Sequence, residues 1–519
     1  MTTITPPVTR SHPPAAIPRG IGDRVRAALA PRERAAAWTL PATLGVLALA
    51  AILYLVNLTV SGYANEFYSA AAWAGSQSWS SWFFGSIDPA NFITVDKPPL
   101  ATMVMGLSVR LFGLSSAAIL LPEALMGVAT VGILMATVRR TFGGVASIIA
   151  GLVMALSPAA VLIFRYNNPD ALLTLLLVGS AYTFLRTIED GRFRWLVLTG
   201  LLVGLAFNTK LLQGWMVLPA FAITYALCAP GSIGRRVAGL AVSLGAVIAA
   251  SSWWVVGMQL VPASLRPYVG GSTDGSALNL ILGYNGLGRL FGGDGNGAGG
   301  GGGASFAGTP GLLRLFNDEM GGQIAWLLPA SAVGFVSGLV ARARARRTDL
   351  ARAAYLMWGL WLATHALVFS FMSGTIHSYY VVVMAPAIGA LVGGGLVALW
   401  GARDRHAWAG AVLGGTVLVS ATLAWMLLDR TPTFVPGLGL GIFVIGVVVA
   451  VALTLPAAIL PRRLPVMALG LALAVLLAGP AAYAADTMAT AYSGGVVSAG
   501  PPASGDIGGP GGAGGPGGG

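Results

Sequence analysis

Thirteen apolar stretches, each long enough to cross a bilayer as a helix, dominate this chain of 519 residues. About 20 helical residues cover the ~30 Å hydrocarbon core. A helix satisfies its backbone hydrogen bonds internally, so we expect an all-α polytopic membrane protein with about 13 transmembrane helices. The stretches lie at residues 38–60, 117–138, 143–163, 170–187, 194–209, 211–228, 236–261, 323–341, 353–371, 378–400, 407–428, 436–459 and 464–484.

The composition agrees with this class and excludes others. Hydrophobic residues make up 56% of the chain and charged residues only 9%, which is typical of membrane proteins. The net charge of +12 does not indicate nucleic-acid binding, because the arginines gather in short loops on one side of the membrane. The single cysteine, Cys228, lies in an apolar stretch and excludes a disulfide framework and a cysteine metal cluster.

The distribution of positive charge predicts the orientation. Segment 98–113 is short, begins with two prolines and contains Arg110. If it does not cross, 22 of the 30 basic residues lie on the side of the N-terminal tail, as the positive-inside rule requires. We therefore expect 98–113 to be an interfacial or re-entrant helix in a multi-pass plasma-membrane protein. The N-terminus is then cytoplasmic, and the C-terminus is extracytoplasmic.

The chain divides into three parts. Residues 1–35, rich in Pro, Arg and Ala, predict a disordered cytoplasmic tail, and residues 36–484 form the transmembrane domain. This domain has two long external loops, 61–116 and 262–322, and the second contains a glycine-rich linker at 292–303. Residues 485–519 are a Gly/Pro-rich external tail, which we expect to be disordered from Ser493.

Charged and aromatic residues gather where the spans reach the outer face. Charges at such positions are costly in lipid and are usually paired or functional. Several clusters at one depth indicate a shared extracytoplasmic polar cavity. The candidates are Asn65, Glu66, Tyr68, Asp96, Lys97, Arg165, Asn168, Asp170, Lys210, His377, Tyr379 and Tyr380.

These residue types suit a sugar donor that is linked to a lipid phosphate. Lysine and arginine make charge-assisted contacts to phosphate oxygens, so Lys97, Lys210 and Arg165 are the predicted phosphate ligands. A carboxylate can take the proton of an attacking hydroxyl, which makes Glu66 and Asp170 the predicted catalytic residues. The other candidates are predicted to contact substrate.

The order of motifs carries a family resemblance. The acidic first loop is followed by Lys97-Pro98-Pro99, Asn168-Pro169-Asp170, Thr209-Lys210 and His377-Ser378-Tyr379-Tyr380. Over roughly residues 38–400 this order resembles the GT-C membrane glycosyltransferases. It is most similar to the protein O-mannosyltransferase and aminoarabinose transferase group (glycosyltransferase family 39), in an actinobacterial-type branch.

The resemblance implies a GT-C architecture with juxtamembrane helices in the first external loop. It also implies a polyprenyl-phosphate sugar donor, used on the extracytoplasmic side without a nucleotide sugar. Asp170 matches the family's acid in the second external loop, and Lys97 matches its donor-phosphate lysine. The family's first-loop motif usually begins Asp-Glu, whereas this chain has Asn65-Glu66. Either Glu66 has taken the role of base, or this branch works differently, or the protein is inactive.

Several alternatives stay open at this stage. A membrane transporter or lipid-carrier flippase also places charges in a membrane cavity. The sugar is undetermined, and the acceptor is a glycan, a lipid or a protein hydroxyl. We expect no cofactor; the alternative is a divalent metal held by Glu66, Asp96 and Asp170. Membrane lipid is an expected partner, and nucleic acid is not.

Overall fold

A computed structural model describes residues 37–292, 306–403, 405–455 and 463–502. This part of the chain is helical, and its β structure is limited to isolated bridges, such as the one between Ile93 and Tyr268. The all-α prediction is therefore confirmed. The predicted tail 1–35, nearly all of the glycine-rich linker and residues 503–519 lie outside the described residues.

Up to residue 260 the helices are α2 (Thr39–Leu55), α3 (Glu66–Gln77), α4 (Trp79–Phe84), α5 (Leu100–Phe112), α6 (Ser116–Phe142), α7 (Gly144–Ala155), α8 (Pro158–Ile163), α9 (Asp170–Asp190), α10 (Phe193–Lys210), α11 (Leu212–Trp215), α12 (Leu218–Cys228) and α13 (Ile233–Leu260). The later helices are α14 (Ala277–Leu282), α15 (Gly288–Phe291), α16 (Asp318–Ile324), α17 (Leu328–Ala341), α18 (Leu350–Phe371), α19 (Ala385–Ala402), α20 (Ala407–Leu428), α21 (Leu438–Thr454) and α22 (Arg463–Ala489). Short 3-10 or π-helical segments are η1 (Leu58–Ser61), η2 (Gly283–Leu287), η3 (Arg314–Phe316), η4 (Ala325–Leu327) and η5 (Ser378–Met384).

Nine helices within the described residues are long and apolar enough to cross a membrane. Other predicted spans fall on shorter helices: 143–163 divides into α7 and α8, and 211–228 into α11 and α12. The count of thirteen is therefore not confirmed. Segment 98–113 forms α5, whose 13 residues extend only about 20 Å at 1.5 Å per residue, which is too short for a simple crossing.

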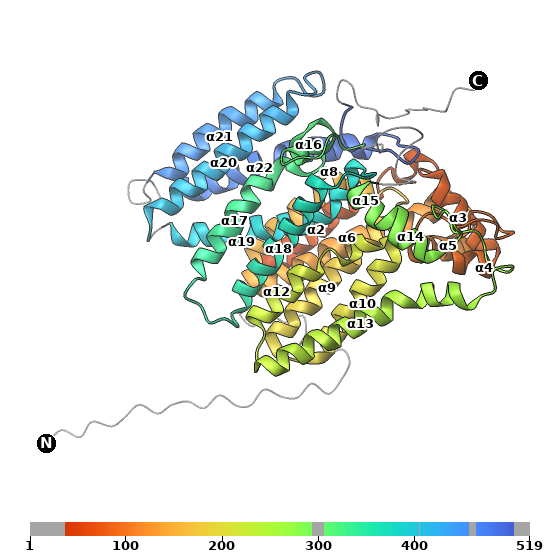
Figure 1. Ribbon diagram of the computed structural model, residues 1–519. Coiled ribbons are helices and arrows are strands. Elements are labelled where there is room, and N and C mark those ends of the chain that lie inside the picture. Colours follow the sequence, from red (N-terminus) through yellow and green to blue (C-terminus); the bar gives the residue numbers. More distant parts are fainter. Residues whose placement is uncertain (1–36, 293–305, 404, 456–462, 503–519) are drawn as a thin grey trace.

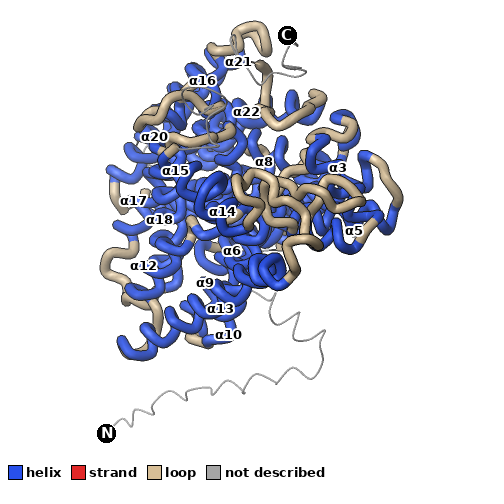
Figure 2. Tube along the Cα trace, turned by 45° about the vertical axis from the view of Figure 1, so that its right-hand side comes forward, coloured by secondary structure: helices blue, strands red, loops and turns tan. Residues whose placement is uncertain are grey.

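The helices pack into one bundle with two distinct sides (Figure 1). Helices α20, α21 and α22 pack against one another along one flank, whereas the 61–116 loop folds into α3, α4 and α5 on the opposite side in this view. Most of α19 is buried between α7, α17 and α18. Figure 2 shows loops gathered around α3, α5 and α14. Long connections therefore meet on one side of the bundle, above its transmembrane helices.

Two helix pairs set the level of the predicted site. Helix α10 packs against both α9 and α13, and Gly200 and Gly204 lie directly against the α13 backbone. Small residues at this spacing allow close helix contact in membranes. Helix α9 begins at Asp170 and α10 ends at Lys210. These two residues consequently come together at the same end of the bundle.

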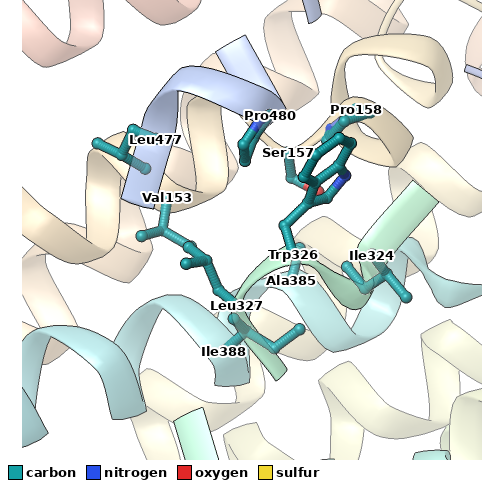
Figure 3. Close-up of a pocket in the computed structure, with 10 residues that line it drawn as sticks. All are labelled: Val153, Ser157, Pro158, Ile324, Trp326, Leu327, Ala385, Ile388, Leu477 and Pro480. Carbon is teal, nitrogen blue, oxygen red and sulfur yellow. The ribbon is translucent and has the colours of Figure 1, made fainter. Parts of the chain in front are cut away.

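A small apolar cavity lies where α22 packs against α7, α8 and α19 (Figure 3). Its volume is about 20 Å³, and its lining includes Val153, Trp326, Leu477 and Pro480. No titratable side chain lines it, and a space of this size holds at most one water. The cavity is therefore a gap in the packing and carries no chemistry. The contacts around it fix the last turns of α22.

The end of the chain differs from its sequence-based expectation. Helix α22 continues past the predicted boundary at residue 485 and ends at Ala489. Residues 493–502, which we expected to be disordered, are described and hydrogen-bonded to the rest of the protein. The reason is that the main chain of this segment finds partners on the side chains of Tyr166, Gln323, Ser378 and Tyr379.

Candidate active site

The structure gathers the predicted site residues around one large cavity on the loop-rich side. Its volume is about 1020 Å³, at the upper end of the range for ligand sites. Ten predicted residues line it: Asn65, Glu66, Tyr68, Asp96, Lys97, Asn168, Lys210, His377, Tyr379 and Tyr380. Asp170 lies behind the lining and contacts Lys210. Arg165 is the one predicted residue that the structure places elsewhere.

The first turn of α3 positions Asn65 and Glu66. Asn65 is the N-cap of α3, and its side-chain oxygen accepts hydrogen bonds from the backbone N–H groups of Phe67 (3.1 Å) and Tyr68 (3.4 Å). The backbone N–H of Asn65 donates to Oδ1 of Asn167 (2.8 Å), and Nδ2 of Asn167 donates to the carbonyl of Asn65 (2.9 Å). The amide of Asn65 thus serves as a helix cap, a role that Asn and Asp perform about equally well.

Glu66 is the first residue of α3 and is exposed to the cavity. Among the described residues no hydrogen bond or ion pair engages its carboxylate, whereas Asp96 and Asp170 both face cations. A general base must be free to accept a proton. Of these three carboxylates, Glu66 fits that requirement best.

Asp96, Lys97 and Arg289 form the charged centre of the cavity. Lys97 Nζ lies 2.7 Å from Asp96 Oδ2, and Arg289 Nη2 lies 3.9 Å from the same oxygen. Burial alone raises the pKa of the Asp96 carboxyl, but the Lys97 ammonium and Arg289 outweigh it and hold that pKa below its ordinary value. Two cations thus share one carboxylate, which leaves one positive charge uncompensated. This cluster is suited to bind a singly charged anion.

Arg289 is held rigidly but keeps an unused donor. Its Nη1 donates to the carbonyl of Thr375 (2.9 Å) and to the hydroxyl of Tyr380 (3.1 Å). Its guanidinium also lies over the Tyr284 ring, 4.7 Å from the centroid. The buried Nε, however, has no hydrogen-bond partner within the described structure. A buried donor without a partner is costly, so Arg289 retains unused hydrogen-bonding capacity beside the cavity.

Arg289 and Tyr284 are site residues that the sequence reasoning missed. Both lie within Gly283–Phe291 of the 262–322 loop, directly before the glycine-rich linker at 292–303, and the sequence analysis singled out neither of them. The available signal was a lone arginine and a tyrosine among glycines in an outer loop. Nothing in the local pattern shows that the loop returns to Asp96, whose carbonyl accepts a hydrogen bond from Asn285.

Asp170 and Lys210 form a fully buried ion pair. Lys210 Nζ lies 2.6 Å from each carboxylate oxygen, and the two side chains are 5% and 0% exposed. The pair joins the N-terminus of α9 to the C-terminus of α10, where the helix dipoles favour an acid and a base respectively. The ammonium also lies 3.5 Å from the centroid of the Tyr380 ring. Because both oxygens of Asp170 are engaged, this residue is better suited to orient Lys210 than to accept a proton.

His377 belongs to an aromatic stack on the cavity wall. Its ring lies between Phe306 (5.0 Å between centroids) and Tyr379 (5.1 Å). Burial, together with the positive charges of Arg289, Lys210 and Lys97, lowers its pKa to about 3. The imidazole is therefore neutral at physiological pH and forms a flat, uncharged part of the cavity wall.

Arg165 has a structural role instead of the predicted contact with phosphate. Its guanidinium donates to the carbonyls of Leu53, Val56 and Asn57 at the end of α2 and to that of Met488 in α22. All four contacts satisfy carbonyls at helix ends, which otherwise lack partners. Arg165 does not line the cavity; it joins the first helix of the bundle to the last.

A second, more apolar pocket adjoins the charged centre. It has a volume of about 160 Å³ and shares Lys97, Lys210, Arg289 and Tyr380 with the large cavity. The rest of its lining is mostly apolar and includes Leu212, Met216, Leu290, Val368, Phe369 and Met372. The cations therefore lie at the junction between a polar space and an apolar one.

The carboxylates do not converge as a metal site would require. Within the described residues no group of three or more His, Cys, Asp or Glu side chains is placed to hold a metal ion. Asp96 and Asp170 each face an ammonium at short distance. No role is assigned to a metal here, and the expectation that none is needed stays a prediction.

Comparison with known proteins connects this geometry to a family. The family model for dolichyl-phosphate-mannose-protein mannosyltransferases matches residues 96–255. The putative mannosyltransferase YkcB of Bacillus subtilis (strain 168) is 31% identical over 497 residues, which cover 79% of this chain and 69% of YkcB. The segment that the family model matches includes the Asp96–Lys97 and Asp170–Lys210 ion pairs.

Two solved structures share the fold. ArnT from Cupriavidus metallidurans in the apo state has a TM-score of 0.51 at 21% identity, covering 84% of this chain and 77% of ArnT. The oligosaccharyltransferase AglB from Archaeoglobus fulgidus, solved with an inhibitory peptide and a dolichol-phosphate, has a TM-score of 0.52 at 14% identity, covering 88% of this chain and 56% of AglB. The predicted GT-C architecture is thereby confirmed.

Proposed function

Because the chain belongs to the dolichyl-phosphate-mannose-protein mannosyltransferase family of GT-C membrane glycosyltransferases, we propose that it transfers a sugar from a polyprenyl phosphate to a hydroxyl outside the cytoplasm. The family assignment sets aside the transporter and flippase alternatives. The chain is a multi-pass membrane enzyme. Mannose is the sugar to test first, because the relative YkcB is a putative mannosyltransferase.

The observation that carries the proposal is the cation pair at the junction of the two pockets. Lys97 and Arg289 share the single carboxylate of Asp96 and keep donors to spare. A polyprenyl-phosphate sugar carries one negative charge. This charge would neutralise the one positive charge that Asp96 leaves uncompensated in the cluster. The phosphate would lie on these cations, with the sugar in the polar cavity and the first isoprene units in the apolar pocket. A dolichol-phosphate in the similarly folded AglB supports this type of ligand.

The chemistry then needs one base and no separate acid. The acceptor oxygen attacks C1 of the sugar while the bond from C1 to the phosphate oxygen breaks, and the electron pair of that bond leaves with the phosphate. Glu66 takes the acceptor proton. Lys97 and Arg289 stabilise the charge that develops on the leaving phosphate. Lys210, oriented by Asp170 and Tyr380, contributes a third positive charge to the cavity.

The proposal is tested by donor consumption. Purified protein in lipid vesicles receives polyprenyl-phosphate mannose labelled in the sugar, and loss of label from the lipid fraction is followed over time. The proposal predicts that label leaves the lipid in proportion to enzyme. Label that crosses the vesicle membrane while still attached to the lipid would instead support a flippase.

The orientation is a separate proposal with its own test. The charge distribution supports an extracytoplasmic cavity. In cells, a cysteine at the exposed position Phe92 should react with an impermeant thiol reagent, whereas one at the exposed position Arg346 should not. Cys228 is buried and gives little background. The reverse labelling pattern would place the cavity in the cytoplasm.

A further inference from the structure

The chain's own C-terminal strap, residues 490–500, forms one wall of the cavity. After α22 ends, the strap turns back over the outer end of the bundle, and Ser493, Gly494, Gly495 and Val496 line the cavity. The backbone N–H of Gly494 donates to the carbonyl of Ala64 (3.3 Å), directly before Asn65 and Glu66. The strap therefore lies beside the first turn of α3.

Tyrosine hydroxyls and polar side chains hold the strap in place at both ends. Tyr166 donates to the carbonyl of Gly494 (2.7 Å), and Tyr379 donates to that of Gly495 (3.4 Å). Further along, the side chain of Gln323 makes two hydrogen bonds to the backbone of Ala499, at 3.0 and 2.9 Å. With anchors on both sides, the stretch between them is a fixed wall.

The strap contacts the part of the cavity that holds the predicted base, and one further partner of the strap, Tyr379, lies beside Lys210. Its partners Ala64 and Tyr166 adjoin Glu66, whose charge, after burial, raises the pKa of the Tyr166 hydroxyl. Lys97 and Arg289 instead bond to Asp96, Thr375 and Tyr380. A donor held by its phosphate on these cations therefore leaves the space between Glu66 and the strap for the acceptor.

We propose that the strap determines which acceptors reach Glu66, by limiting the width of the cavity where the acceptor hydroxyl must enter. This inference rests on the proposed function and extends it. Gly494 and Gly495 present only main chain to the cavity, so the strap leaves open space beside them for an acceptor. The acceptor hydroxyl forms its bond to C1 of the sugar, loses its proton to Glu66, and displaces the polyprenyl phosphate with the bonding electron pair.

Gly495 offers a direct way to test this wall. A Cβ built at Gly495 meets no heavy atom within 4 Å, and its backbone is outside the left-handed region. A side chain at this position therefore begins in open space on the cavity wall. Gly311 provides a matched control, because its Cβ also meets nothing within 4 Å and the residue does not line the cavity.

The experiment compares Gly495→Trp and Gly311→Trp with the unmodified protein. Polyprenyl-phosphate mannose is offered with four acceptors of increasing size, namely water, methanol, butanol and octyl mannoside. In Gly495→Trp we expect hydrolysis by water and donor affinity to stay within about twofold, while transfer to octyl mannoside falls about tenfold or more, with intermediate losses between. Gly311→Trp should match the unmodified protein for every acceptor.

Two results with Gly495→Trp would overturn this inference without touching the proposed function. One is an equal loss of activity with all four acceptors, and the other is no change with any of them. Gly495→Ala distinguishes an effect of side-chain size from misfolding. Its transfer to octyl mannoside should fall less than that of Gly495→Trp, and its donor affinity should equal that of the unmodified protein. If the unmodified protein consumes no donor with any acceptor, including water, the proposed function itself fails.

Discussion

Breaking the buried pair between Asp170 and Lys210 separates the structural demands of the site from its chemistry. Lys210→Met removes an ammonium that lies 2.6 Å from both oxygens of a carboxylate with no exposure. The remaining charge is then buried without a partner, which costs about 3–5 kcal/mol of the free energy of unfolding. The lost contact with the Tyr380 ring adds to this cost.

The double variant Lys210→Met/Asp170→Leu should recover more than half of that loss. Replacing both members of a buried ion pair by apolar residues of similar size is often neutral or stabilising. Only the favourable position of an acid at the N-terminus of α9 is then lost, at about 0.3–1 kcal/mol. The double variant should nevertheless remain impaired in sugar transfer, because the cavity has lost one of its three cations.

Equilibrium unfolding in mixed micelles of SDS and dodecyl maltoside, followed by tryptophan fluorescence, measures these free energies. Arg192→Met is a matched control, because the Arg192 side chain is 62% exposed and its Nε lies as far as 4.0 Å from Asp190 Oδ2. This substitution should change the free energy of unfolding by no more than about 0.5 kcal/mol. A Lys210→Met variant as stable as the unmodified protein would refute the reasoning. So would additive losses in the double variant, since contacting residues should couple.

Three further predictions follow from the assigned roles. Arg289→Gln should weaken the binding of polyprenyl-phosphate mannose, measured by titration, by about 1–3 kcal/mol. Arg110 lies outside the cavity lining, so Arg110→Gln should not change the affinity. If Arg289→Gln binds the donor as tightly as the unmodified protein, Arg289 is not part of the phosphate site. Arg165→Gln should lower the free energy of unfolding by about 3 kcal/mol or more, because several charge-assisted bonds to helix-end carbonyls are lost. It should leave donor affinity unchanged. A loss of donor affinity without a loss of stability would restore the predicted phosphate role of Arg165. Burial and nearby cations lower the pKa of His377 to about 3. Donor affinity should therefore not change with pH over roughly pH 5–8, either in the unmodified protein or in His377→Gln. A pH-dependent change in affinity that is present in the unmodified protein and absent from His377→Gln would contradict a neutral imidazole.

The sequence predicted most of the cavity because helix ends obey simple rules. Asp170 begins a helix and Lys210 ends the next one, so two antiparallel neighbours bring them to the same level. Asp96 and Lys97 are adjacent in the chain, and their pairing needs no knowledge of the fold. Positions of this kind follow from the alternation of apolar spans and polar ends.

The contributions of the long loops could not be predicted in the same way. Arg289 reaches Asp96 from a distant glycine-rich segment, and the strap reaches Ala64 from the far end of the chain. Such contacts depend on how the loops fold over the bundle, which hydrophobic periodicity does not encode. The sequence neighbours of Arg165 do not show that its guanidinium turns toward the carbonyls of α2 and α22.

Asn65, at the position where the family resemblance implies an aspartate, serves as a helix cap. Asn65 caps α3 through its side-chain oxygen, so an aspartate there would direct its oxygens to the same N–H groups. Asn65→Asp should therefore fold normally. Glu66, one position later, has its carboxylate in the cavity and free of the contacts that engage Asp96 and Asp170.

Release of labelled mannose from polyprenyl phosphate by Glu66→Gln, beside the unmodified protein, tests the central claim most directly. The account predicts that the unmodified protein consumes the donor, and that Glu66→Gln loses at least about 100-fold in turnover, as expected for removal of a general base. Donor affinity should remain within about threefold, because the phosphate is held by Lys97 and Arg289 through charge-assisted contacts. Near-normal turnover in Glu66→Gln would contradict the assignment of the base, and an unmodified protein that leaves the donor intact would contradict the proposed reaction.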